Sequence, residues 1–217
     1  MRRSSSPSPR ASRERAALVR RGPLVIEDDY DGEFRYDRKL VGAVQALAPE
    51  RVVYIGTASK TLAPALRLAW LVLPRELVDP VLAAMTAAGW RPPVLDQLVL
   101  ADMIDSGAYD RHARRSRAAY RGRRDQLLGA LPEGLRPAGI SAGLHLVLPL
   151  PEGVSEQQVV AAARRRSLTV DGLGRQWIRA GEDRPQGLVL GYGTPARHAF
   201  APTVDILTRT LRDVGLR

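Results

Sequence analysis

The sequence contains no cysteine, which excludes disulfide bonds and thiolate metal sites. Lysine is almost as scarce, because Lys39 and Lys60 are the two lysines among 33 basic residues. The three histidines, His112, His145 and His198, are too dispersed for metal ligands, so no metal site is predicted. No apolar run approaches the roughly 20 residues of a membrane span, and no apolar segment of a secretory signal follows the basic start. These absences predict a soluble protein of the cytoplasm.

The composition is that of a folded protein with a basic surface. The 217 residues are 45% hydrophobic, enough for the core of one large domain or two small ones. The formal net charge of +10 could indicate a nucleic-acid partner. The arginines are dispersed, however, which favours an arginine-rich surface and a basic N-terminal tail. The arginine-rich stretch at residues 111–124 is likewise interpreted as an exposed helix.

Short apolar runs alternate with helical patterns, an arrangement typical of an α/β fold. Residues 1–13 are rich in Ser, Arg and Pro and are predicted to be a disordered basic tail. Residues 14–131 are predicted to form part of a large domain with a linking helix. The Pro and Gly residues at 134–143 mark the start of a small C-terminal domain, residues 132–217. The elements expected after a helix end at 14–21 are strands at 24–29, 51–57 and 66–74, helices at 75–88, 93–106 and 109–131, a strand at 143–150, a helix at 155–166, strands at 167–172 and 187–193, and a helix at 198–214.

Lys60 follows the second predicted strand and is a candidate for a reactive amine. A buried or half-buried lysine loses its preference for the ammonium form, and the neutral amine can attack an aldehyde. The hydroxyls of Thr57 and Ser59 could bind phosphate just before it. Arg67, seven residues later, could add a charge-assisted hydrogen bond to the same phosphate. Each feature alone is weak, because a lone lysine after a strand is most often a surface residue.

The first predicted strand ends in three acids, Glu27, Asp28 and Asp29, followed by Tyr30. Ligands bind at the carboxyl ends of parallel strands, so these side chains are candidates for a site. A carboxylate there can keep a pyridine nitrogen protonated, and a tyrosine can bond to a ring hydroxyl. Adjacent strand residues face opposite sides of the sheet, which favours Asp28 over Asp29 for this role.

Taken together, the segments VIEDDYDGEFRYDRK and VVYIGTASKTLAPALRLAWLVLP resemble the cofactor-lysine region of MocR-type proteins. These are GntR-superfamily regulators in which a winged helix-turn-helix precedes a domain similar to class I/II aminotransferases. The segments AGLHLVLPLP and GLVLGYG resemble the small-domain strands of the same proteins. The resemblance implies an α/β fold of the fold-type I class that binds pyridoxal 5'-phosphate (PLP). It would be the C-terminal part of such a domain, with a partial, mainly parallel sheet and a small α+β domain.

The resemblance also implies a role for each residue of the motif. Lys60 would be the catalytic residue, joined to the cofactor as a Schiff base. Asp28 would pair with the pyridine nitrogen, and Tyr30 would bond to the phenolic oxygen of the ring. The phosphate would be bound by Thr57, Ser59 and Arg67.

Two departures from the family limit what the resemblance implies. The DNA-binding domain, the phosphate loop and the ring that stacks on PLP are not recognisable, so a truncated domain with weak PLP binding is expected. Val189 also stands where aminotransferases usually carry the arginine that binds the substrate carboxylate. Three interpretations follow: the effector domain of a MocR-type transcription regulator without its DNA-binding region, a PLP-dependent aminotransferase acting on an amino acid, or a non-functional fragment. The expected partners are an amino-acid or amine ligand, a second copy in a homodimer, and DNA only through the missing domain.

Overall fold

The computed structural model describes residues 22–36, 42–139, 141–178 and 184–216. The chain forms two compact units, one up to residue 117 and one from residue 118 onward. The predicted tail at 1–13 and helix end at 14–21 lie outside the described residues. The expected boundary between the large domain (14–131) and the small domain (132–217) stays a prediction, because the two compact units are groups of residues in contact and do not show which segments fold independently.

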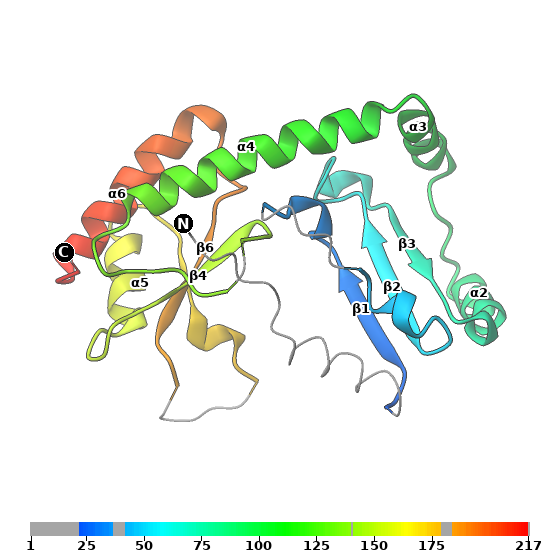
Figure 1. The fold of residues 1–217 in the computed structure, drawn as a ribbon, viewed down its shortest axis with the longest axis horizontal. Helices are drawn as coiled ribbons and strands as arrows, with labels where there is room; N and C mark the ends of the chain where they lie inside the picture. Colours follow the sequence, from blue (N-terminus) through cyan, green and yellow to red (C-terminus); the bar gives the residue numbers. More distant parts are fainter. Residues whose placement is uncertain (1–21, 37–41, 140, 179–183, 217) are drawn as a thin grey trace. The chain divides into compact units, whose positions relative to one another are not determined.

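The first unit contains a three-stranded sheet in the order β1-β2-β3 (Figure 1). Its strands are β1 (Val25–Asp29), β2 (Val52–Thr57) and β3 (Ala69–Val72). β1 and β2 are parallel, whereas β3 runs antiparallel to β2. Apolar residues start each strand, and Val52 is fully buried at the start of β2. The three expected strands are therefore present, and each is shorter than its predicted span.

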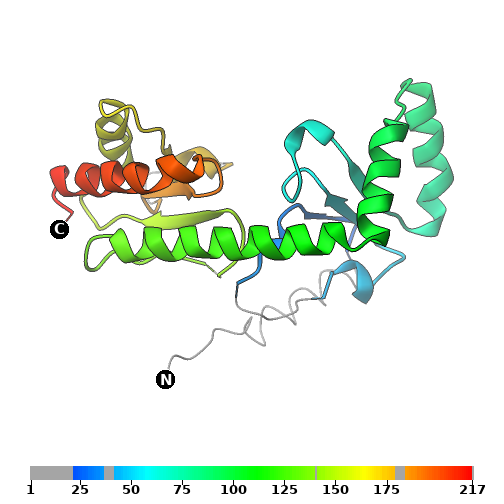
Figure 2. The ribbon, with the colours of Figure 1, turned by 90° about the horizontal axis from the view of Figure 1, so that it is seen from above.

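The helices of the first unit follow the predicted order with shifts of a few residues. They are the 3-10 helices η1 (Gly32–Phe34), η2 (Gln45–Leu47), η3 (Pro64–Leu66) and η4 (Arg75–Leu77), and the α-helices α2 (Val78–Ala87), α3 (Val94–Asp105) and α4 (Ala108–Ala130). α4 is one uninterrupted helix that belongs to both units (Figure 2). α2 and α3 are rich in apolar residues, yet neither has a buried residue. Their apolar faces are therefore open to solvent in this chain.

The second unit is an α+β arrangement around an antiparallel sheet in the order β4-β6-β5. Its elements are β4 (His145–Pro149), α5 (Glu156–Arg164), β5 (Asp171–Gly172), η5 (Leu173–Gln176), β6 (Gly187–Gly191), η6 (Arg197–Ala199) and α6 (Phe200–Asp213). The core of this unit includes the fully buried Leu148, Val159, Leu188 and Leu211. β5 is shorter than the predicted strand at 167–172, because two of its residues pair with β6 and Ser167 has a left-handed backbone (φ 56°).

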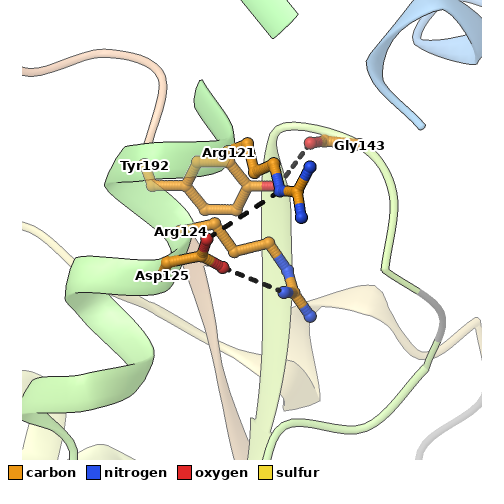
Figure 3. A network of polar contacts seen from close by, with 5 residues as sticks. All are labelled: Arg121, Arg124, Asp125, Gly143 and Tyr192. Atoms are coloured by element: carbon orange, nitrogen blue, oxygen red, sulfur yellow. Dashed lines mark hydrogen bonds and ion pairs between the residues drawn. The ribbon is translucent and has the colours of Figure 1, made fainter. Parts of the chain in front are cut away.

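Tyr192 fixes the end of β6 to the loop before β4. Its buried hydroxyl donates a hydrogen bond to the carbonyl of Gly143 (Figure 3). Arg123 of α4 donates to the carbonyls of Tyr192 (3.3 Å) and Gly193 (2.9 Å). The expected exposed helix at 111–124 is therefore confirmed only in part, because Arg117 and Arg123 both donate hydrogen bonds to backbone carbonyls outside the helix. Figure 3 also shows Asp125 with its two arginine neighbours, a surface group of the kind that adds little stability.

None of the helices among the described residues is long and apolar enough to cross a membrane.

Candidate functional site

The carboxyl ends of β1 and β2 lie at the same edge of the first sheet, because the two strands are parallel. Asp28 is paired in register with Ile55, and Thr57 lies two residues after Ile55. Side chains two residues apart on a strand point to the same face, so Asp28 and Thr57 share one face of the sheet. The tertiary structure therefore brings together the two halves of the predicted motif.

Lys60 lies in the turn that follows β2, and its side chain is exposed. Its Nζ lies 6.0 Å from the centroid of the Tyr30 ring, at the outer limit of a cation–π contact. The buried or half-buried environment expected for Lys60 is not found in this chain, where its side chain is exposed. The physical reason is that Lys60 lies at a turn beyond the end of the strand, where few described residues cover it.

The hydroxyl of Thr57 is engaged within the lysine loop. It donates to the carbonyl of Leu68 (2.9 Å) and accepts from the backbone amide of Ser59 (3.1 Å). Thr57 therefore holds together the two ends of the segment that carries Lys60. A direct bond from Thr57 to phosphate stays a prediction, as does the role of Ser59.

Arg67 ends η3 in the left-handed region of the backbone, with φ 49°. An arginine in this conformation is uncommon, and such residues cluster at ligand sites because the surrounding structure must hold them there. The Arg67 side chain is exposed and forms no hydrogen bond or ion pair among the described residues. Its guanidinium is therefore available to an anion.

The two aspartates of β1 have different environments. Asp29 is half-buried and accepts a hydrogen bond from the hydroxyl of Tyr54 (2.8 Å). Burial, followed by the bond to Asp29, raises the pKa of Tyr54 to about 12. Asp28 is exposed on the other face of the sheet and forms no hydrogen bond or ion pair among the described residues. Asp28 is thus the carboxylate that remains available at this edge.

Tyr30 lies just beyond the end of β1, where it is 40% exposed. The negative charge of Asp31 is the main reason its pKa is raised, with burial and Asp28 adding to the effect. Tyr30 and Thr57 line a small cavity of about 250 Å³ together with Asp29, Tyr54 and Trp70, whereas Lys60, Asp28 and Arg67 do not line it. A neutral tyrosine hydroxyl at this position can donate a hydrogen bond to an anionic oxygen.

The chemistry of these groups fits PLP. An amine can bond to the aldehyde, a carboxylate can bind the protonated pyridine nitrogen, and a guanidinium can bind the phosphate. Lys60, Asp28 and Arg67 supply these three groups around one sheet edge. No cluster of metal-binding side chains occurs among the residues that the structure describes.

A second set of polar residues, which no pattern in the sequence predicts, lies around Thr61. Glu33 accepts hydrogen bonds from the hydroxyls of Thr61 and Tyr109, the latter at 2.5 Å. His112 binds the carbonyl of Thr61 at 2.7 Å, and Arg117 donates to the carbonyl of Glu33 at 2.6 Å. Thr61 follows Lys60 directly, but the three α4 residues are distant in sequence. Tertiary contact alone links them to the lysine.

Val189 lies in the middle of β6, where it is half-buried. It is paired in register with Val147 of β4 and Asp171 of β5. A valine at this position offers no group that could bind a carboxylate.

No protein-family model matches the chain. The chain is 36% identical to the HTH-type transcriptional regulator YhdI of Bacillus subtilis over 176 residues, which are 78% of this chain and 37% of YhdI. It is 33% identical to the probable rhizopine catabolism regulatory protein MocR of Rhizobium meliloti, over 77% of this chain and 35% of MocR. The chain therefore spans little more than a third of the length of these relatives.

The fold is that of the aminotransferases. The structure of LysN, the α-aminoadipate aminotransferase of Thermus thermophilus, superimposes with a TM-score of 0.82 and 26% identity. The match covers 97% of this chain and 56% of LysN, whose structure contains N-(5'-phosphopyridoxyl)-L-leucine. The predicted fold class, the C-terminal part of a fold-type I domain, is thereby confirmed. The chain is part of an aminotransferase-like domain of the MocR type.

Proposed function

We propose that this chain binds PLP covalently through Lys60 and acts as part of the effector domain of a MocR-type transcription regulator. The observation that carries the proposal is the gathering of Lys60, Asp28 and Arg67 at one sheet edge. Asp28 and Arg67 have no hydrogen bond or ion pair there among the described residues. Lys60, Asp28 and Arg67 are all exposed, so each charged group is open to a ligand from solvent. Their availability favours a ligand that carries charges of both signs.

Each residue has a distinct task in this proposal. Lys60 holds the aldehyde carbon, Asp28 keeps the pyridine nitrogen protonated, and Arg67 binds the phosphate together with Ser59. Tyr30 donates to the phenolic oxygen, and Thr57 shapes the loop through its bond to Leu68. PLP, when bound, supplies an electron sink that an amino compound can use.

The regulatory interpretation rests on the relatives and on Val189. The regulators YhdI and MocR are more similar to this chain than LysN is. An aminotransferase also needs a firm hold on the substrate carboxylate, and the valine in β6 cannot provide one. The ligand would be an amino acid or an amine that meets PLP at Lys60. Homodimer formation, a cytoplasmic location and DNA binding through a helix-turn-helix region complete the proposed role of the whole protein.

An absorbance titration of the purified chain with PLP tests the proposal. A band at roughly 400–430 nm, the range expected of a protonated imine, should grow with PLP and be absent in Lys60→Ala. Lys39→Arg is the matched control, because it removes the other lysine while keeping the charge. Borohydride reduction followed by peptide mapping then shows which lysine carries the label.

Equal labelling of Lys39 and Lys60 would contradict the proposal, since a specific site must favour Lys60. A mutant without Lys60 that still gives the band would contradict it as well. An added amino acid that removes the band and is released as its keto acid would instead support the aminotransferase alternative. The regulatory proposal predicts that the band shifts on adding an amino compound but that no keto acid accumulates.

A further inference from the structure

The turn that carries Lys60 is held by the residue that follows it. Thr61 is 5% exposed, whereas the neighbouring Lys60 side chain is open to solvent. The hydroxyl of Thr61 donates to one carboxylate oxygen of Glu33, and the carbonyl of Thr61 binds Nε2 of His112 at 2.7 Å. Thr61 is therefore anchored through its side chain and its backbone at once.

Glu33 comes from η1, just after β1, and its carboxylate is bound by two hydroxyls. Tyr109 donates to the second oxygen at 2.5 Å. Burial, followed by this bond, raises the pKa of Tyr109 to about 12, so the hydroxyl keeps its proton at neutral pH. Hydrogen bonds to a carboxylate are about twice as strong as those between neutral groups. Arg117 also fixes the Glu33 backbone by donating to its carbonyl at 2.6 Å.

His112 supplies the second anchor from α4. A carbonyl oxygen can only accept a hydrogen bond, so Nε2 of His112 must carry the hydrogen that points at Thr61. Ser116, one turn further along α4, lies 3.3 Å from the same nitrogen, so its hydroxyl oxygen can accept only a weak share of the hydrogen that points at Thr61. Ala113, beside His112, is 7% exposed, which places this part of α4 against the body of the unit.

We propose that Glu33 and His112 are positioning residues that grip Thr61 from two sides and thereby fix the backbone that carries Lys60. Neither residue touches the lysine amine, and the inference concerns where that amine is held. It rests on the proposed function insofar as Lys60 is the residue that binds PLP. The amine must come to about 3–3.5 Å from the aldehyde carbon in the right orientation, and Lys60 itself has a long, flexible side chain. A rigid backbone immediately after it limits where the amine can go.

Thr61→Val is the sharpest test, because it keeps the shape of the side chain and removes the hydroxyl. Amide hydrogen exchange measures the stability of the loop around Lys60 without PLP. Two amides report on it: that of Leu62 donates to the carbonyl of Ala58 (2.8 Å), and that of Ala58 donates to the carbonyl of Leu68 (3.1 Å). We expect Thr61→Val to raise exchange at these amides about tenfold, the cost of about one charge-assisted hydrogen bond. Thr61→Ser, which restores the hydroxyl, should return exchange to the wild-type rate.

Reductive trapping with PLP and borohydride reads the effect on Lys60. The rate of labelling at Lys60 should fall about tenfold in Thr61→Val and recover in Thr61→Ser, while labelling at Lys39 stays constant. Thr86→Val is the matched control, since Thr86 is exposed on α2 and, within the part of the chain that the structure describes, its hydroxyl bonds to the carbonyl of Leu82 one turn before and to no other group. Circular dichroism of each variant shows whether the fold is kept.

The two readouts separate the inference from the proposed function. Unchanged exchange in Thr61→Val, or no recovery in Thr61→Ser, would overturn the grip on Thr61. Faster exchange with normal trapping at Lys60 would overturn its link to the lysine but leave PLP binding in place. Faster exchange in a chain whose wild type never favours Lys60 would refute the proposed function and leave the anchored loop standing.

Discussion

The hydroxyl of Tyr54 donates a 2.8 Å hydrogen bond to the carboxylate of Asp29, on the face of the sheet opposite to Asp28. Tyr54 is paired in register with Glu27, so the bond runs diagonally between two parallel strands on one face. The two aspartates therefore differ in environment although they are adjacent in sequence. Asp29 is engaged within the fold, whereas Asp28 is exposed and forms no hydrogen bond or ion pair among the described residues.

Conservative substitution of each aspartate should separate these roles. Asp28→Asn should weaken PLP binding about tenfold, because an amide cannot keep the pyridine nitrogen protonated as a carboxylate does. Asp29→Asn should leave PLP binding unchanged and lower the free energy of unfolding by about 1 kcal/mol, through the weaker bond to Tyr54. Absorbance titration measures the first effect and urea unfolding the second. The assignment would be reversed if Asp29→Asn alone impaired PLP binding.

Alkaline pH should destabilise the chain through the half-buried Tyr109. The pKa of Tyr109 is raised from 10 to about 12 in the folded state, so between these values the folded chain binds more protons than the unfolded chain. The contribution of Tyr109 to the free energy of unfolding is therefore complete below pH 10 and is lost as the pH rises through about 12. Tyr109→Phe should flatten this fall in a series of urea unfolding curves. Tyr120→Phe is the control, and an equal slope in wild type and Tyr109→Phe would refute the prediction.

Glu156 should be essential for the stability of the second unit. It is 5% exposed, and its carboxylate accepts hydrogen bonds from the backbone amides of Gly174 (2.9 Å) and Gly187 (3.1 Å). Glu156→Ala leaves both amides without this partner and should lower the free energy of unfolding by about 2–3 kcal/mol. Glu152→Ala, at an exposed position, should change it by less than about 0.5 kcal/mol. Equal unfolding midpoints for the two variants would show that the amides find other partners.

The apolar faces of α2 and α3 should make the isolated chain prone to association. A groove of about 810 Å³ is lined by Leu82, Trp90 and Leu100 from these helices and the loop between them, and Leu95 is 77% exposed. Leu95→Glu should reduce light scattering and dye binding without lowering the free energy of unfolding. Leu127→Ala, at a site that is 4% exposed, should cost about 2–5 kcal/mol. A large loss of stability in Leu95→Glu would show that this face is covered in solution.

The sequence predicted the first sheet and its motif because local patterns carry that information. Apolar runs bounded by acids at Asp28 and by hydroxyls at Thr57 specify strands whose ends can hold a ligand. The alternation of side chains along a strand separates Asp28 from Asp29 without any structure. The helices were also predicted to within a few residues. The short β5 was not, because the left-handed turn at Ser167 depends on how α5 meets the sheet.

The tertiary structure alone decided which groups surround Lys60. The sequence determined that a lysine, an acid and an arginine occur in the order and spacing of a PLP site. It could not indicate that Glu33 and His112 both bind Thr61, since residues 33, 61 and 112 are far apart in the chain and no local propensity links them. Hydrogen bonds of this kind are set by how α4 packs against η1 and the loop after β2. Such packing is settled by the summed burial of many side chains rather than by any one segment.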